Sequence, residues 1–184
     1  MAPGKVGSPA CGLAIAALLG TLATPGVARA YEDQWSLFAG AGYSFTSGAE
    51  LPQHGVALGI GAGLGLGDTW ELRVEASYAI HPGDTPLHRI GGAAEIVYVV
   101  DILTVVPFFG VGLGGAVTIL DAATADGGGV RGDFVAQGVV GLDWLVSREF
   151  VLGVEVRPRV LLTSLPTDAL WLTATLRAQV LFEL

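Results

Sequence analysis

Cysteine and lysine are nearly absent from this sequence of 184 residues, which contains one of each. Cys11 and Lys5 both lie close to the N-terminus, so the rest of the chain can form neither a disulfide framework nor a cysteine-ligated metal site. Basic residues are scarce as well, because nine Lys and Arg stand against 17 Asp and Glu for a formal net charge of −8. A chain this acidic is not expected to bind nucleic acid.

The N-terminal segment has the three parts of an export signal. Lys5 lies in a short basic region, the apolar run 11–19 follows, and Ala28-Arg29-Ala30 has the small-x-small pattern of a cleavage site. We therefore expect a secretory signal peptide over residues 1–30, removed on export. A retained membrane anchor is the alternative, but the run is short and is followed by glycine and proline. Removal leaves seven Arg against 17 acidic residues.

The remaining residues, 31–184, lack a hydrophobic run long enough for a transmembrane helix. Such a helix needs about 20 consecutive apolar residues, and the longest candidate, 96–106, is interrupted by Asp101. Hydrophobic residues nevertheless make up 52% of the sequence, which is high for a soluble protein of this size. The apolar side chains must therefore follow another pattern.

That pattern is a strict alternation, clearest between Trp70 and Ile80. Every even position of this segment is apolar, whereas Glu71, Arg73 and Glu75 occupy odd positions. Successive side chains of a strand point to opposite faces, so the segment forms a strand with one apolar and one charged face.

Eight segments with this alternation follow one another along the chain. They cover residues 35–46, 56–66, 70–80, 89–101, 105–118, 133–146, 150–162 and 170–183. No charged side chain, and no polar side chain other than Tyr and Trp, interrupts the apolar face of any of them. Lipid explains this regularity, because a charge facing the bilayer midplane costs about 2–4 kcal/mol. The sequence therefore predicts one domain over residues 31–184, an all-β, eight-stranded antiparallel transmembrane up-and-down barrel.

The connections alternate in length. Residues 67–69, 101–104 and 147–149 form short turns, and the intervening connections are longer and rich in Gly, Pro, Asp and Thr. In an outer-membrane barrel the short turns face the periplasm and the long loops face outward. The alternative is a soluble, lipocalin-like barrel whose apolar face turns inward.

Aromatic residues on the apolar face gather near the segment ends, as in the girdles at the two membrane interfaces. They are Trp35, Phe45, Trp70, Tyr78, Tyr98, Phe134, Trp144, Phe150 and Phe182, whereas Tyr43 and Phe109 are expected to lie a little deeper. Two prolines, Pro107 and Pro158, each remove a donor from the strand ladder. We expect Pro107 near a rim, and Pro158 at a bulge or at the outer rim.

Charged residues of both signs share the predicted inward face. They are Glu71, Arg73, Glu75, Arg89, Glu95, Asp143, Glu155, Arg157, Arg159 and Arg177. An eight-stranded barrel is just wide enough to be filled by side chains, and buried charges must be paired. We therefore expect an Arg–carboxylate network that closes the lumen, with room provided by glycines on neighbouring segments. The alternative is a narrow or gated ion path along the same residues.

Other candidate sites are weaker. His54, His81 and His88 lie in or beside the expected outer loops, but no serine accompanies a histidine at catalytic spacing on one strand face. The pattern Gly-x-Gly-x-x-Gly at 110–115 lies inside a strand and not before a helix, so it does not indicate a dinucleotide site. The acidic loop 121–133 does not have the spacing of a calcium-binding EF-hand. We expect no catalytic residue, no metal site, no cofactor and no enzymatic activity, although a lipid-modifying enzyme remains an alternative.

Two stretches resemble a known family. Val105-Val-Pro-Phe-Phe-Gly-Val-Gly-Leu-Gly114 is similar to a Pro-aromatic-x-Gly-x-Gly strand opening, and 141–157 resembles the penultimate hairpin of the same barrels. The family is the outer membrane protein A/X-type eight-stranded β-barrel superfamily, and the resemblance covers residues 31–184. Leu184 stands where the family usually has a terminal Phe, and no periplasmic peptidoglycan-binding domain is expected.

The resemblance implies a porin-like barrel in the cell envelope of a Gram-negative bacterium. Its expected partners are outer-membrane lipid and lipopolysaccharide, the barrel-assembly machinery during insertion, and an unidentified ligand at the surface. The expected role is envelope-structural or surface interaction.

Overall fold

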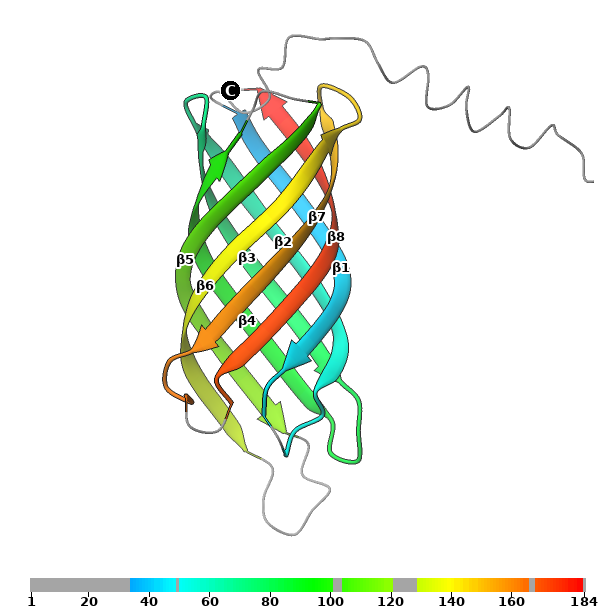
Figure 1. Ribbon diagram of the computed structural model, residues 1–184, viewed down its shortest axis with the longest axis vertical. Coiled ribbons are helices and arrows are strands. Elements are labelled where there is room, and N and C mark those ends of the chain that lie inside the picture. Colours follow the sequence, from blue (N-terminus) through cyan, green and yellow to red (C-terminus); the bar gives the residue numbers. More distant parts are fainter. Residues whose placement is uncertain (1–33, 49, 101–103, 121–128, 166–167, 184) are drawn as a thin grey trace, which may run out of the picture.

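The computed structural model describes residues 34–48, 50–100, 104–120, 129–165 and 168–183. The predicted signal peptide, Asp101 and Leu184 lie outside these ranges. The strands are β1 (Gln34–Thr46), β2 (His54–Leu66), β3 (Trp70–His81), β4 (Leu87–Val99), β5 (Val105–Leu120), β6 (Val130–Leu145), β7 (Phe150–Leu161) and β8 (Leu170–Glu183). Each strand pairs antiparallel with the next, and β8 closes on β1 (Figure 1). The predicted eight-stranded antiparallel barrel is confirmed.

The register gives the barrel a strong stagger. Paired residues can be followed once around the wall, and the path returns to β1 ten residues beyond its start. The path is Ser36, Gly63, Arg73, Glu95, Gly112, Gln137, Arg159, Trp171 and Thr46. Such a stagger requires strands tilted by roughly 35–45°, which is visible as their common slope in Figure 1.

The two ends of the barrel differ. The short connections lie at the end where Gln34 pairs with Glu183, and the long connections lie at the other end (Figure 1). Gly67, in the short β2–β3 turn, has a φ of 74°, a left-handed conformation that glycine adopts without strain. Within the described ranges, no helix is long and apolar enough to cross a membrane.

The β5–β6 hairpin is longer than predicted. Its strands have 16 residues each, and the pairing continues to Ile119 and Val130, beyond the expected ends at 118 and 133. The alternation that lipid imposes is only needed inside the bilayer, whereas hydrogen bonding between two strands continues into water. Strands predicted from the lipid-facing alternation are therefore shorter than the observed strands in this hairpin.

The apolar face turns outward along every strand. Val111, Leu113 and Leu176 expose 70–71% of their surface, whereas the charged side chains that alternate with such residues are buried. This arrangement is the reverse of a soluble barrel. The lipocalin-like alternative is therefore wrong, because it requires the apolar face to line the interior.

The two strand prolines have different surroundings. Pro107 is the third residue of β5, near the short-turn end, and its carbonyl accepts a hydrogen bond of 2.9 Å from the Val100 amide. At Pro158 the β6–β7 pairing is interrupted between Val156 and Arg159, but the offset is the same on both sides. Of the two expected positions, the bulge is wrong, because the proline removes a donor without inserting a residue. Pro158 is the fourth residue from the end of β7 that leads to the long β7–β8 connection, toward the expected outer rim.

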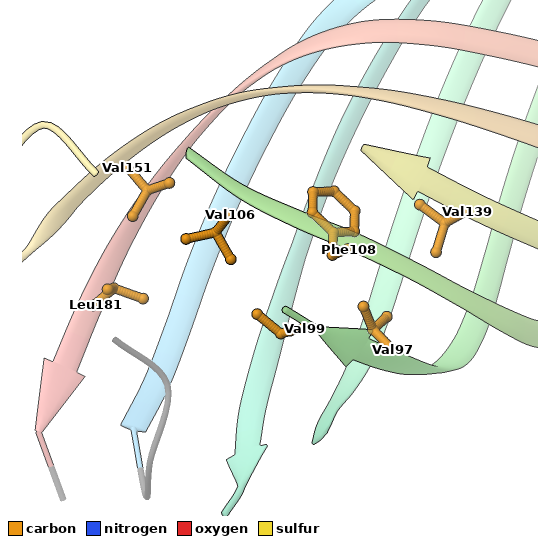
Figure 2. Close-up of a cluster of buried hydrophobic side chains, with 7 residues drawn as sticks. All are labelled: Val97, Val99, Val106, Phe108, Val139, Val151 and Leu181. Carbon is orange, nitrogen blue, oxygen red and sulfur yellow. The ribbon is translucent and has the colours of Figure 1, made fainter. Parts of the chain in front are cut away.

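The interior contains two apolar clusters that the charge pattern did not predict. We take the long-loop end of the barrel as its top, which is the reverse of the view in Figure 1. The lower cluster, near the short turns, comprises Val97, Val99, Val106, Phe108, Val139, Val151 and Leu181, which point toward one another from β4–β8 (Figure 2). The upper cluster, toward the long loops, comprises Ala57, Ala79, Ala116, Val135, Leu161 and Trp171.

Candidate functional site

A layer of ion pairs fills the lumen between the two apolar clusters, and Arg157 on β7 is its centre. The Arg157 guanidinium forms an ion pair with Glu75 and lies 3.2 Å from Glu155 and 3.5 Å from Glu95. All four side chains are buried. They come from β3, β4 and β7, so the layer crosses the barrel interior and joins strands that are not adjacent in the wall.

Arg159 extends this layer toward the upper cluster. It lies 2.5 Å from Glu75 and donates hydrogen bonds to Gln137 Oε1 at 2.9 Å and to Thr173 Oγ1 at 3.1 Å. The Gln137 amide in turn donates to Glu95. Glu75 and Glu155 thus each accept more than one hydrogen bond, as burial of charge requires. Glu95 accepts one through Oε1, and its Oε2 has Arg157 as an ion-pair partner at 3.5 Å without a hydrogen bond.

Two further ion pairs lie beside the lower cluster. Arg73 donates to Glu71 at 2.6 and 2.8 Å, and Arg177 donates to Asp143 at 2.5 and 2.6 Å. Both guanidinium groups also lie over the ring of Phe108, at 4.5 and 4.8 Å from its centre. Cation–π contacts of this kind couple the ionic layer to the apolar cluster below it.

Glycines make room for this filling, as expected, but aromatic rings use much of the room. A Cβ at Gly61 would lie 2.3 Å from the Phe38 ring, and one at Gly141 would lie 2.3 Å from the Phe108 ring. At Gly63 and Gly153 the nearest side-chain atom is instead a carboxylate oxygen, of Glu71 and of Asp143 respectively. The Phe38 and Phe108 rings therefore fit under the ionic layer because the adjacent wall residues are glycines, which have no side chain.

A separate charged cluster closes the mouth at the long-loop end, and Arg89 belongs to it and not to the central layer. Asp168 accepts hydrogen bonds from Arg89, from Thr46 Oγ1 at 2.6 Å and from Arg131 at 3.2 Å. Asp133 accepts hydrogen bonds from Arg131 at 3.0 Å and from two hydroxyls of the β7–β8 connection. We call these residues the mouth cluster.

Trp171 joins the mouth cluster to the central layer. Its ring lies between the guanidinium groups of Arg89, 5.3 Å from the ring centre, and Arg159, 4.3 Å from it. The indole N–H donates to Ser44 Oγ at 2.9 Å. The upper apolar cluster is thus held between two charged layers.

Sequence reasoning missed Asp133, Gln137, Asp168 and Trp171 as parts of the lumen filling. The period-two pattern places Asp133 and Gln137 on the inward face of β6, but the predicted charge network did not include them. Trp171 likewise occupies an inward position of β8. Asp168 lies in a connection, where no periodicity indicates the direction of a side chain.

Loss of the Asp168 carboxylate is expected to release the β7–β8 connection from the mouth. We predict that Asp168→Ala increases the rate of proteolytic cleavage between residues 162 and 169 by about tenfold or more, equivalent to ~1.4 kcal/mol of local stability. Arg89 would remain buried without its carboxylate. The matched control is Asp84→Ala, which removes an exposed acid from another loop. Equal cleavage rates for both variants would refute the prediction.

The predicted girdle residues form two groups on the outer wall, where Tyr43 and Phe109 are exposed as well. Trp35, Trp70, Tyr98, Trp144, Phe150 and Phe182 lie toward the short turns, and Phe45, Tyr78 and Phe134 lie toward the long loops. Eight residues separate Trp70 from Tyr78 along β3. At about 3.4 Å per residue and a tilt of ~40°, the two groups are about 20 Å apart along the barrel axis, close to the height of the apolar band of an outer-membrane barrel.

The three histidines lie at strand ends and not in free loops. His54 begins β2, His88 is the second residue of β4, and both are on the outer face. His81 ends β3, points inward and is fully buried. The hydroxyls beside the outer histidines belong to Tyr43 and Tyr78.

A cavity of about 20 Å³ lies within the central layer, lined by Glu75, Arg157 and Thr175 among others. A space of this size holds about one water molecule. It is too small for a hydrated ion, and the apolar clusters lie above and below the layer that contains it.

No protein-family model matches this sequence, and no curated protein matches it. Solved structures match its fold. The crystal structure of Neisserial surface protein A matches with a TM-score of 0.65 and 16% identity over 82% of this chain and 97% of that chain. Ail, the attachment invasion locus protein of Yersinia pestis, matches with a TM-score of 0.63 and 14% identity over 82% of this chain and 99% of that chain.

The outer membrane protein OprG from Pseudomonas aeruginosa matches with a TM-score of 0.60 and 11% identity over 84% of this chain and 98% of that chain. At these identities the likeness concerns the fold. The chain has the fold of the small eight-stranded outer-membrane barrels, and the predicted resemblance is confirmed at that level.

Proposed function

We propose that this chain is an integral protein of a bacterial outer membrane, with a lumen that does not conduct and an envelope-structural or surface-interaction role carried by its long loops. The observation that carries the proposal is the filling of the lumen. The lower apolar cluster, the central ion layer, the upper apolar cluster and the mouth cluster follow one another along the barrel axis. A passing ion would have to disrupt both apolar clusters and the paired charges between them.

A narrow or gated channel is the first alternative. The cavity beside Arg157 and the unpartnered Oγ of buried Ser77 favour some hydration within the central layer. Hydration there is not sufficient for conduction, because rings such as Phe38 and Phe108 and the mouth cluster would also have to move.

Single-channel recording in a planar bilayer tests the proposal. We expect no discrete current steps from the purified protein once its insertion is confirmed by protection of the barrel from protease. A larger water-filled porin in the same bilayer serves as the positive control. Reproducible steps of fixed amplitude would overturn the non-conducting lumen and favour the channel.

A lipid-modifying enzyme is the second alternative, and the Tyr–His pairs on the outer wall are the feature that favours it. A nucleophilic mechanism needs a nucleophile, a base and a group that orients the base, commonly within a concave pocket. The two pairs supply two such groups on the convex wall of a barrel. We therefore propose that the protein has no catalytic activity and no cofactor.

The proposed partners follow from this location. They are the lipid and lipopolysaccharide around the barrel, the barrel-assembly machinery during insertion, and an unidentified ligand of the long loops. Export by a cleaved signal peptide over residues 1–30 belongs to the same proposal. The short turns would then face the periplasm.

A further inference from the structure

His81 differs from the other two histidines because its side chain lies inside the barrel. It is the last residue of β3, three residues beyond Tyr78 of the upper aromatic group, and it is fully buried. The ring fits closely against β2, since a Cβ at Gly55 would lie 2.6 Å from its Cδ2 atom. Within the described ranges, neither nitrogen of the ring has a hydrogen-bond partner. The site therefore encloses an imidazole without the acceptors that an imidazolium would need.

Charged and titratable groups from three other parts of the chain act on this imidazole. They are Arg89 of β4, His54 of β2 and Asp168, which lies two residues before β8. Asp168 is shared by the guanidinium groups of Arg89 and Arg131, and Arg131 also forms an ion pair with Asp133 of β6. The mouth cluster thus contains two guanidinium groups and two carboxylates, and its charge is balanced while His81 is neutral.

A proton on His81 would add a third cation to this cluster. Burial and the neighbouring Arg89 both favour the neutral ring. Asp168 attracts a proton to the ring, but its oxygens already accept hydrogen bonds from Thr46 and from two arginines. The closed mouth therefore binds neutral His81, and a proton can be accommodated only when the cluster separates and the ring reaches water.

We propose that His81 makes closure of the barrel mouth dependent on pH, so that Asp168 separates from Arg89 in mildly acidic surroundings. A solvated imidazole binds a proton below about pH 6.5. The open mouth then gains a proton that the closed mouth does not bind. By proton linkage, the closed mouth is most stable above this pH and loses stability as the pH falls through it.

This inference goes beyond the proposed function and does not depend on it. The central ion layer and the lower apolar cluster lie below the mouth, so they can keep the lumen closed when the mouth cluster separates. The pH dependence would instead change which groups the long-loop end presents to water. A protein whose role lies in that end would have different surfaces at neutral and at acidic pH.

Amide hydrogen exchange of the purified protein in detergent measures opening of the mouth. The amides of Ser164 and Asp168 donate backbone hydrogen bonds of 3.1 and 2.9 Å there. Each exchange rate is divided by the rate of an unstructured peptide at the same pH, which gives a protection factor. We expect both protection factors to fall about 30-fold between pH 7.5 and pH 5, because the open population grows almost tenfold for each unit below 6.5. The Val99 amide, bonded to Thr69 at the short-turn end, should keep its protection factor.

Two substitutions assign this effect to His81. His81→Leu and His81→Gln both remove the titrating ring, and each should make the protection factors at the mouth independent of pH. The matched control is His54→Leu, which removes an exposed histidine at the same end and should retain the decrease. Constant protection in the unsubstituted protein, or the same decrease in the His81 variants, would overturn the proposal.

A second measurement does not require a change at His81. The combined variant His54→Leu and His88→Leu leaves His81 as the only histidine of the chain. Its imidazole nitrogens should give the NMR signals of a neutral ring down to pH 5.5. Titration of these signals with a midpoint near pH 6.5 would show that the closed mouth accepts the proton, and it would refute the pH-dependent closure.

Discussion

An arginine at position 140 is expected to destabilise the barrel in a bilayer by about 2–4 kcal/mol, whereas the same substitution at position 130 should cost about 0–1 kcal/mol. Val130 and Val140 are both on β6, both face outward, and expose 74% and 54% of their surface. Val140 lies between the two aromatic groups, and Val130 lies beyond the upper one. The two variants thus differ in depth and in little else.

Urea unfolding of the protein in lipid vesicles measures this difference as the change in the free energy of unfolding. Val140→Arg places a charge against hydrocarbon, and Val130→Arg places the same charge in water or among headgroups. The same comparison in detergent micelles should show a smaller difference, because a micelle deforms more readily around a charge. Equal losses of stability for the two variants in vesicles would contradict a membrane-spanning orientation.

Replacement of Arg157 is expected to have the largest effect of any single substitution inside the lumen. Arg157→Met removes the cation shared by Glu75, Glu95 and Glu155, all buried, and should lower the free energy of unfolding by about 3–5 kcal/mol. Arg148→Met, in the exposed β6–β7 turn, makes the same chemical change and should stay within about 0.5 kcal/mol of the unsubstituted protein.

A second substitution separates loss of the ion pair from loss of packing. Addition of Glu155→Gln to Arg157→Met removes one of the uncompensated charges and should restore part of the stability. The double-mutant cycle compares the unsubstituted protein, Arg157→Met, Glu155→Gln and the double variant. Its coupling energy is expected to be about 0.5–3 kcal/mol. A loss below about 1 kcal/mol for Arg157→Met would show that water or another cation compensates the carboxylates, and would favour a hydrated lumen.

The fold could be predicted almost completely, because a lipid-spanning strand imposes a local rule at every second residue. Charge at an outward position is costly, so the alternation between Trp70 and Ile80 identifies both the strand and the direction of each side chain. The strand ends were less accurate, as β5 and β6 show, because hydrogen bonding continues where the lipid stops. At Pro158 the missing N–H donor predicted an interruption of the strand pairing, but not whether an extra residue would be inserted there.

The lumen could be predicted only in part. Alternation indicated which charges face inward, but the partners depend on the stagger of ten residues around the barrel, which brings Glu75 of β3 to Arg157 and Arg159 of β7. No local pattern encodes that stagger, since it results from the closure of all eight strands. The separation of Arg89 from the central layer has the same origin.

The sequence by itself therefore determined the number of strands, their faces and the presence of opposite charges inside, because each follows from a rule that acts within one strand. The tertiary structure alone decided which charges pair, where the two apolar clusters close the lumen, and that Asp168 reaches the mouth from a connection. It also decided that His54 and His88 lie beside tyrosines on the outer wall and His81 inside it. These features join residues of different strands, and only closure of the barrel sets the distances between them.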